Sequence, residues 1–306
     1  MLGFIFLSHG LLGYYNIYEP QIKENYQTSR HVNILYSEKE ITLKDPPVSE
    51  VLSDKILVKI RMKPINPIIA SKIENQLFFN NYSNLSEEDF DHLDISKKEF
   101  VKKVLPIIIN ENQNILITRN FIDNLKIKLE KIKTLNSNEI NKLNYIARKY
   151  NIEHDNKHKL DLVEEILLNV DVIPNSIALA QAAIESGWGK SRFALEYNAL
   201  FGEYTYDPNK GVIPLKRDHG DKHLIKAFSS YDNSVSSYFN NINSHDAYKN
   251  FRVFRNVMRS KNNFSNIYLL VNNLNTYAED DNYVNTLKAV IEKNNFDIFD
   301  SKVISY

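Results

Sequence analysis

The chain has 306 residues, of which 43% are hydrophobic and 25% are charged. This composition is typical of a foldable soluble protein and argues against intrinsic disorder. Lysine and arginine together number 38, as do aspartate and glutamate, so no global charge favours nucleic acid as a partner. The absence of cysteine excludes disulfide bonds, thiol catalysis and cysteine-ligated metal centres.

The first segment, residues 1–18, contains no Lys, Arg, Asp or Glu and is rich in leucine, isoleucine and phenylalanine. It is apolar enough for a signal-peptide core or a short membrane anchor. Basic residues before the apolar core and a cleavage site of small residues are both missing, so a buried strand or helix is the alternative. We expect export or inner-membrane anchoring, in the periplasm or cell envelope, mainly because the function argued below requires it.

Residues 19–85 combine strand-like pieces with several prolines and are predicted to be a linker or spacer. A helical arm is predicted over 86–158, beginning with an acidic first turn. Within the arm, Pro106 predicts either a kink or two consecutive helices, followed by helices at about 119–135 and 138–150.

The last predicted segment, residues 159–299, is expected to be the catalytic domain. A helix at 160–169 leads into it, a strand-rich insert occupies about 200–228, and three or four more helices follow. Helices around a small β-lobe indicate an α+β fold that is mostly α, with a cleft between two lobes.

A carboxylate near the end of a small-residue helix is the most informative local feature. Pro174 suits the first turn of this helix and Gly187 its end, which places Glu185 in the last turn. The helix dipole and the apolar neighbours both disfavour negative charge there, so the pKa of Glu185 should be raised. A carboxylic acid that stays protonated near neutral pH can protonate the leaving oxygen of a glycosidic bond.

Glu185 and Trp188 each also have a purely structural interpretation. Glu185 is also placed to form a salt bridge with Arg192, as glutamates at helix ends often do. Trp188, the only tryptophan, lies three residues beyond Glu185 and can either line a sugar-binding cleft or belong to the core.

The sequence Ala-Gln-Ala-Ala-Ile-Glu-Ser-Gly-Trp-Gly at 180–189 closely resembles the signature of bacterial glucosaminidase domains, a family of peptidoglycan hydrolases. The Asn-Ala-Leu-Phe-Gly turn at 198–202, the strand at 226–231 and the Tyr-rich element at 274–283 are similar to further elements of that family. Within it, the upstream helix at 97–108 and the strand at 212–217 resemble the Bax branch of Gram-negative bacteria. The resemblance covers about residues 96–295 and implies a lysozyme-like domain with a small β-hairpin lobe.

By this resemblance, Glu185 is the general acid, and Tyr277 occupies a position where the family often has a tyrosine that faces the reacting sugar. Packing alone is the alternative for Tyr277. The other residues expected to line the substrate site, from the motif helix, the turn after it and the strand that follows, are Gln181, Trp188, Asn198, Phe201, Gly202 and Tyr231. Gly202 should have a positive φ or little room around it.

The second carboxylate is less clear, because the positions that carry an acid in many glucosaminidases are Lys216 and Arg217 here. Asp218 and Glu203 are candidates to replace it, against the simpler reading of solvated hairpin or strand residues. Without a second carboxylate, the substrate's own N-acetyl group could attack the anomeric carbon. Alternatively, a muramyl hydroxyl could close an anhydro ring, as in lytic transglycosylases.

The sequence therefore predicts an endo-β-N-acetylglucosaminidase that cleaves the β-1,4 bond between N-acetylglucosamine and N-acetylmuramic acid in peptidoglycan. The alternatives are a lytic transglycosylase and a catalytically weak wall-binding protein. The glycan strand is the expected partner, and no metal or organic cofactor is implied. The spacing of His154 and His158 is that of a zinc-binding pair, but neither an apolar helix nor a His-Glu-x-x-His pattern surrounds it.

Overall fold

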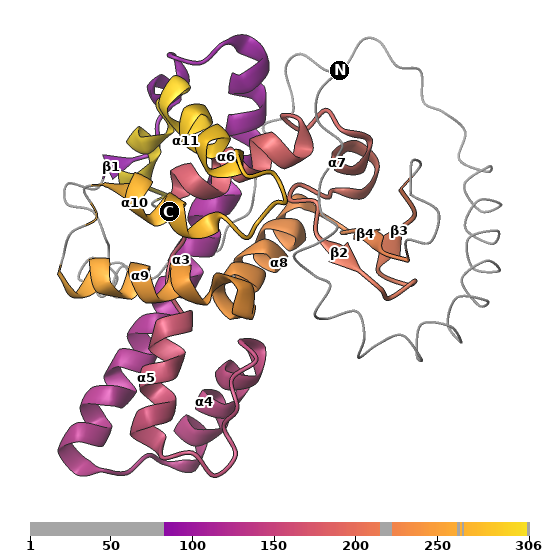
Figure 1. Ribbon diagram of the computed structural model, residues 1–306. Helices are drawn as coiled ribbons and strands as arrows, with labels where there is room; N and C mark the ends of the chain where they lie inside the picture. The colour runs from indigo at the N-terminus through magenta and orange to yellow at the C-terminus, as the bar shows by residue number, and fades with distance from the viewer. Residues whose placement is uncertain (1–82, 215–221, 262–263, 265, 305–306) are drawn as a thin grey trace.

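The computed structural model describes residues 83–214, 222–261, 264 and 266–304. The predicted segments 1–18 and 19–85 therefore lie outside the described residues, except for the last three positions. Most of the described chain is helical, with a few short strands (Figure 1). The α+β, mostly α, lysozyme-like class predicted from the sequence is confirmed.

The longest element is helix α3, Ile95–Ile132, which runs for 38 residues from the main body into the lower lobe of Figure 1. The Asp94 side chain caps its first turn by accepting from the Lys97 amide at 3.0 Å. Pro106 lies inside this helix, and the helix continues past it, so the expected separate helix from about 119 is wrong. The fully buried Val104, Leu105 and Ile108 around the proline anchor the helix to the core and offset the lost hydrogen bond.

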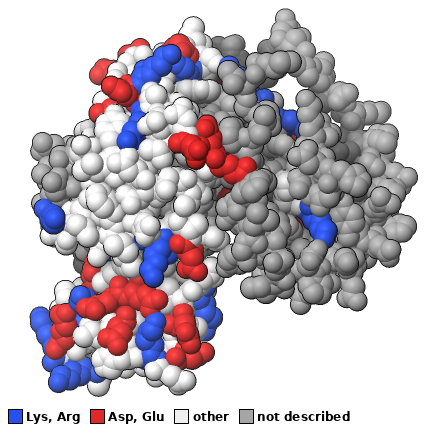
Figure 2. Space-filling model, viewed as in Figure 1, with Lys and Arg blue, Asp and Glu red and all other residues white. Residues whose placement is uncertain are grey.

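Two shorter helices pack near the C-terminal half of α3 to form the lower lobe: α4, Ser137–Lys149, and α5, Lys159–Asn169. Helix α4 begins with a reciprocal capping box between Asn136 and Glu139, as a helix predicted to start near 138 requires. Basic and acidic side chains are interspersed over the surface of this lobe, whereas the face of the main body above it is largely uncharged (Figure 2). Such mixed charge is typical of a solvated surface.

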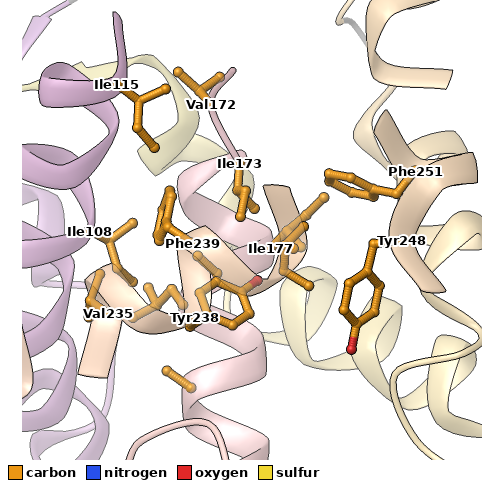
Figure 3. Packing of buried hydrophobic residues seen from close by; sticks show 14 of the residues in the cluster. Ile108, Ile115, Val172, Ile173, Ile177, Val235, Tyr238, Phe239, Tyr248 and Phe251 are labelled. Carbon is orange, nitrogen blue, oxygen red and sulfur yellow. The ribbon is translucent and has the colours of Figure 1, made fainter. Parts of the chain in front are cut away.

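Helix α6, Asn175–Ser186, crosses the middle of the main body, in contact with α3 and with elements near the C-terminus. Every residue from Asn175 to Ala183 is buried, so this part of the helix is enclosed on all sides. Figure 3 shows Phe239 of α8, Tyr231–Ser244, between Ile108 of α3 and Ile177 of α6.

The remaining helices close the core around α6. They are, in chain order, α7, Arg192–Tyr197; η2, Asp246–Tyr248; α9, Lys249–Ser260; α10, Ile267–Val271; η3, Asn272–Leu274; α11, Tyr283–Lys293; and η4, Phe296–Ser301. Of these, α11 and η4 pack directly against α6. A short helix, η1, Glu87–Phe90, precedes α3 and follows the capping residue Ser86.

Two small sheets complete the fold. Strands β1, Ser83–Asn84, and β5, Lys302–Val303, pair in parallel and join the two ends of the described chain. The β-lobe is a three-stranded antiparallel sheet in the order β2-β4-β3, with β2 at Tyr204–Thr205, β3 at Gly211–Val212 and β4 at Leu224–Lys226. A Cβ at Gly211 would lie 2.5 Å from the Thr205 methyl group, so only glycine fits there.

A buried ionic network lies where α5, α8 and α9 meet. The Asp171 carboxylate is paired with Arg119 at 3.3 Å and with Arg259, and Arg255 donates to the backbone oxygens of Asp171 and Val172 at 3.0 and 2.9 Å. Arg119 and Arg255 also bond carbonyl groups at the C-terminal end of α5, which a helix leaves without intrahelical partners. This network holds the lower lobe to the main body.

Candidate active site

The two ends of α6 are held by different chemistry, and this fixes where the helix delivers Glu185. At its N-terminal end, the Asp300 carboxylate accepts from the Ser176 amide at 2.8 Å and from the Ser176 hydroxyl at 2.7 Å. A carboxylate is favourable there because the helix dipole is positive at this end. Burial nevertheless raises the pKa of Asp300 to about 7, since this carboxyl group is fully enclosed.

The C-terminal end of α6 turns sharply after Ser186. Gly187, Trp188 and Gly189 all have positive φ, at 57°, 58° and 72°. The Trp188 amide bonds back to the Ala183 carbonyl at 2.8 Å, and the Gly189 amide bonds the Ser186 hydroxyl at 2.8 Å. These bonds stop the helix one residue after Glu185, so its side chain projects from a rigid last turn.

The Glu185 carboxyl group lies in a partly buried position with a single hydroxyl partner, Tyr283. Burial raises the pKa of Glu185 to about 7, and the Tyr283 hydrogen bond, which favours the carboxylate, offsets only part of this effect. The direction agrees with the sequence prediction. The competing salt bridge is absent, because Arg192 pairs with Glu196 at 3.3 Å.

Four tyrosines surround this carboxyl group, and burial together with the negative charge of Glu185 raises the pKa of each: Tyr238, Tyr248, Tyr277 and Tyr283. The rings of Tyr277 and Tyr283 stack at 5.5 Å between centroids, and Tyr248 lies 6.0 Å from Tyr277. Sequence reasoning named only Tyr277, whose buried hydroxyl donates to the Phe201 carbonyl at 3.1 Å. The hydroxyl that bonds Glu185 belongs to Tyr283, six residues later in the same motif.

Gln181 was predicted to contact substrate, but the structure encloses it completely. Its amide nitrogen donates to the Tyr283 hydroxyl at 3.0 Å, and its oxygen accepts from the Tyr238 hydroxyl at 2.5 Å. Gln181 therefore orients Tyr283 toward Glu185 from behind. No face of the side chain is open to a ligand in this geometry.

The Asn198–Gly202 turn lies against Glu185. Asn198 has a φ of 52° and its amide donates to the Phe228 carbonyl at 3.0 Å, which ties the turn to the segment after β4. Phe201 is buried and stacks on Tyr238 at 3.9 Å. Gly202 has a φ of 62°, as predicted, and a Cβ built on it would lie 3.5 Å from Glu185 Oε2. The missing side chain leaves open the space beside the carboxyl group.

Of the two candidates for a second carboxylate, Asp218 lies outside the described residues. Glu203 follows Gly202 directly and is largely buried, so the reading of a solvated strand residue is wrong for it. Its Oε2 accepts from the Ser237 hydroxyl at 2.9 Å and lies 3.4 Å from the Lys226 ammonium, while Oε1 is buried with no hydrogen-bond partner among the described residues. Burial raises the pKa of Glu203, and the Lys226 charge opposes that shift.

Trp188 and Tyr231, the other two predicted binding residues, both contact the N-terminal half of α3. Trp188 is partly buried, packs edge-on against Phe100 at 5.8 Å and has the Lys97 ammonium 5.2 Å from its ring centroid. Tyr231 is buried, and its hydroxyl lies 3.4 Å from the Ala194 carbonyl. Trp188 thus lies at the edge of the core and is partly exposed, whereas Tyr231 belongs to the core.

This fold and this site define a class. A lysozyme-like domain that presents one carboxyl group of raised pKa beside an open turn is the arrangement of a glycoside hydrolase, in which that group can protonate a leaving oxygen.

Comparison with known proteins narrows the class. Residues 161–296 match the glucosaminidase family model, described as mannosyl-glycoprotein endo-beta-N-acetylglucosaminidase. The chain is 30% identical over 199 residues to Protein bax of Escherichia coli (strain K12). The aligned region covers 65% of this chain and 69% of that protein. No solved structure gives a significant match. The chain belongs to the Bax-like glucosaminidase family and is a glycoside hydrolase.

The predicted membrane anchor falls on residues 1–18, outside the described part of the chain. Within the described residues, none of the helices combines the length and the apolar character needed to cross a bilayer.

Proposed function

We propose that the protein is an endo-β-N-acetylglucosaminidase that hydrolyses the β-1,4 bond between N-acetylglucosamine and N-acetylmuramic acid in peptidoglycan, with Glu185 as general acid. The observation that supports this most strongly is the state of the Glu185 carboxyl group. It has a pKa of about 7, a tyrosine hydroxyl as its partner, and open space beside Gly202. The family match supports a glycan as the substrate.

The proton transfer follows from these contacts. Protonated Glu185 gives its proton to the bridging oxygen, and the electron pair of the breaking C–O bond moves to that oxygen as it leaves. Glu185 becomes a carboxylate, which the Tyr283 hydroxyl stabilises by donating a hydrogen bond. Gln181 holds Tyr283 in that orientation from the buried side. A water molecule then completes the hydrolysis and returns a proton to Glu185.

Positive charge develops at the anomeric carbon as the bond breaks, and a nearby negative charge lowers the barrier. We infer that Glu203 supplies this charge. Burial raises the pKa of Glu203, but the Lys226 charge and the Ser237 hydrogen bond at Oε2 oppose that shift and favour the carboxylate, and Oε1 has no hydrogen-bond partner among the described residues. Because this oxygen is enclosed, Glu203 acts through its field, and attack on the sugar falls to water or to the substrate's N-acetyl group.

The test is mass spectrometry of the products released from purified sacculi by the full chain and by Glu185→Gln. New reducing ends at N-acetylglucosamine that are absent with the variant support the proposal. Products with 1,6-anhydro ends would instead identify a lytic transglycosylase. Tight binding of both proteins to sacculi with no release would identify a wall-binding protein.

We also propose that the protein acts in the periplasm or cell envelope, since its proposed substrate lies there. Fractionation of cells that express the full chain checks this location, and recovery only with the cytoplasm would contradict it.

A further inference from the structure

A groove with a cavity volume of about 540 Å³ lies between α11, the turn after α6 and the start of α3. One wall is a single face of α11, because Asn285, Thr286 and Lys293 recur at helical spacing after Asn282. The opposite wall is formed by Trp188 and Lys97. None of these side chains takes part in the proton transfer described above.

The groove and the contacts of the proposed catalytic group share two elements, α11 and the turn after α6. Helix α11 starts at Tyr283, whose hydroxyl bonds Glu185, and Trp188 follows Glu185 by three residues. From Asn282 to Lys293 the helix advances about 16 Å at 1.5 Å per residue. The groove is therefore a surface apart from the Glu185 contacts, and a long polymer can occupy both.

The lining has a consistent chemistry. Both charged residues that line it, Lys97 and Lys293, are cationic, and three amides and a hydroxyl add neutral hydrogen-bonding groups. Lys293 is exposed. The Lys97 ammonium lies over the Trp188 ring and forms an ion pair with the exposed Asp94 carboxylate at 3.2 Å. A ligand with carboxylates and polar amide or hydroxyl groups fits such a wall.

We propose that this groove is a second binding site of the enzyme, in which Lys97 and Lys293 bind carboxylates of the substrate strand. The inference rests on the proposed function, because it takes peptidoglycan as the substrate. Free carboxylates occur on the peptides of that polymer and, once the peptides are removed, on the lactyl groups of its muramyl units. The groove makes the enzyme prefer charged strands, whereas chemistry at Glu185 needs no such charge.

The experiment compares wild type with the double variant Lys97→Gln/Lys293→Gln on three substrates: intact sacculi, sacculi with carboxylates amidated by a carbodiimide and ammonia, and strands stripped of peptides by an amidase. On intact sacculi the variant should show a KM raised about three- to tenfold and an unchanged kcat. The difference should vanish on amidated sacculi, and also at 1 M salt. A difference that is lost on stripped strands shows that only peptide carboxylates are bound, and one that persists there shows that the lactyl carboxylates freed by the amidase are bound as well.

Lys288→Gln is the matched control, since Lys288 lies on the same helix and bonds Asn272 at 2.6 Å outside the groove. This variant should match wild type on every substrate. Equal losses for the double variant on charged and amidated sacculi, or no loss on either, would overturn the proposal.

A failure of the proposed function is separable from a failure of the groove. If wild type releases nothing from any substrate, the binding of wild type and the double variant to intact and amidated sacculi still tests the two lysines. Weaker binding of the variant to intact sacculi alone supports the groove, and equal binding refutes it.

Discussion

Two carboxyl groups of this protein, one buried and one partly buried, have opposite environments. Asp171 is enclosed by Arg119, Arg255 and Arg259, and although burial opposes ionisation, these guanidinium groups hold its pKa below the usual value. Burial raises the pKa of Glu185 to about 7. A tyrosine hydroxyl, and no cationic side chain, opposes that shift. The same chemical group is thus kept charged in one region and close to neutral in the other.

The difference separates structural use of a carboxyl group from chemical use. A charge enclosed by three arginines holds helices together but cannot exchange a proton near neutral pH. A carboxyl group without a cation is costly when ionised, and this cost makes it a useful acid. Glu203 lies between these cases, because a lysine and a serine satisfy one of its oxygens and nothing satisfies the other.

The sharpest way to break the comparison is Glu185→Gln, which keeps the shape and removes the proton. Activity should fall by about 10²- to 10⁴-fold, the usual contribution of a general acid. Because the folded pKa of Glu185 is raised from 4.5 to about 7, wild type loses stability as pH rises across that window. The variant, neutral at every pH, should be more stable than wild type by about 3 kcal/mol above pH 8.

Denaturant unfolding at about pH 4 and pH 8 measures this difference. The two proteins should have similar stability at the lower pH, where Glu185 is protonated. A variant that is less stable than wild type at the higher pH would show that Glu185 is paired, as Asp171 is, and the contrast between the two regions would be lost.

Asp171→Asn should have the opposite result for stability. It leaves Arg119 and Arg259 buried without their counter-charge and should lower the free energy of unfolding by about 3–5 kcal/mol. Since the folded pKa of Asp171 is lowered, its contribution is present at neutral pH and is lost as pH falls through that pKa. Urea unfolding measures the loss.

Glu164→Gln is the control for that measurement, because Glu164 pairs with Lys126 at 2.9 Å and is more than half exposed. Its cost should be under about 1 kcal/mol. Equal costs for the two variants would mean that the buried network contributes no more than a surface pair.

Glu203→Gln tests the intermediate case. It keeps the hydrogen bond to Ser237 and removes the charge, so kcat should fall about tenfold while KM stays unchanged, as expected for stabilisation of the transition state alone. Kinetics on sacculi at a fixed pH provide the measurement. Glu196→Gln, which alters only an exposed ion pair with Arg192, should leave kcat as it is. A rise in KM with kcat intact would assign Glu203 to substrate binding.

The proposed acid could be found from the sequence because its determinants are local. Pro174, Gly187 and the small residues between them define the helix, its end and the apolar setting of Glu185 within a dozen positions. The positive φ of Gly202 follows in the same way from its place in a tight turn. The α+β class was predictable for the same reason, since helical spacing and a strand-rich insert are also local patterns.

The rest of the site depends on contacts between distant segments. Tyr238, Tyr248 and Tyr283 come from three separate elements, and in a chain with 18 tyrosines nothing local distinguishes them. Gln181 was assigned to the substrate site as part of the motif helix, but a local motif cannot show that α11 and α8 cover its side chain. The continuity of α3 through Pro106 depends on the same kind of burial.

The smallest expected effect separates the two stacked tyrosines of the site. Tyr283→Phe removes the hydrogen bond that lowers the pKa of Glu185, so that pKa should rise above about 7. Activity requires protonated Glu185 and is lost as pH rises through its pKa, so the alkaline limb of the pH–rate profile should move to higher pH. Tyr277→Phe removes a hydroxyl that bonds only the Phe201 carbonyl, so that limb should stay in place. If Tyr277→Phe moves the limb and Tyr283→Phe does not, the tyrosine named from the sequence is the one that tunes the acid, and the geometry assigned to Tyr283 is wrong.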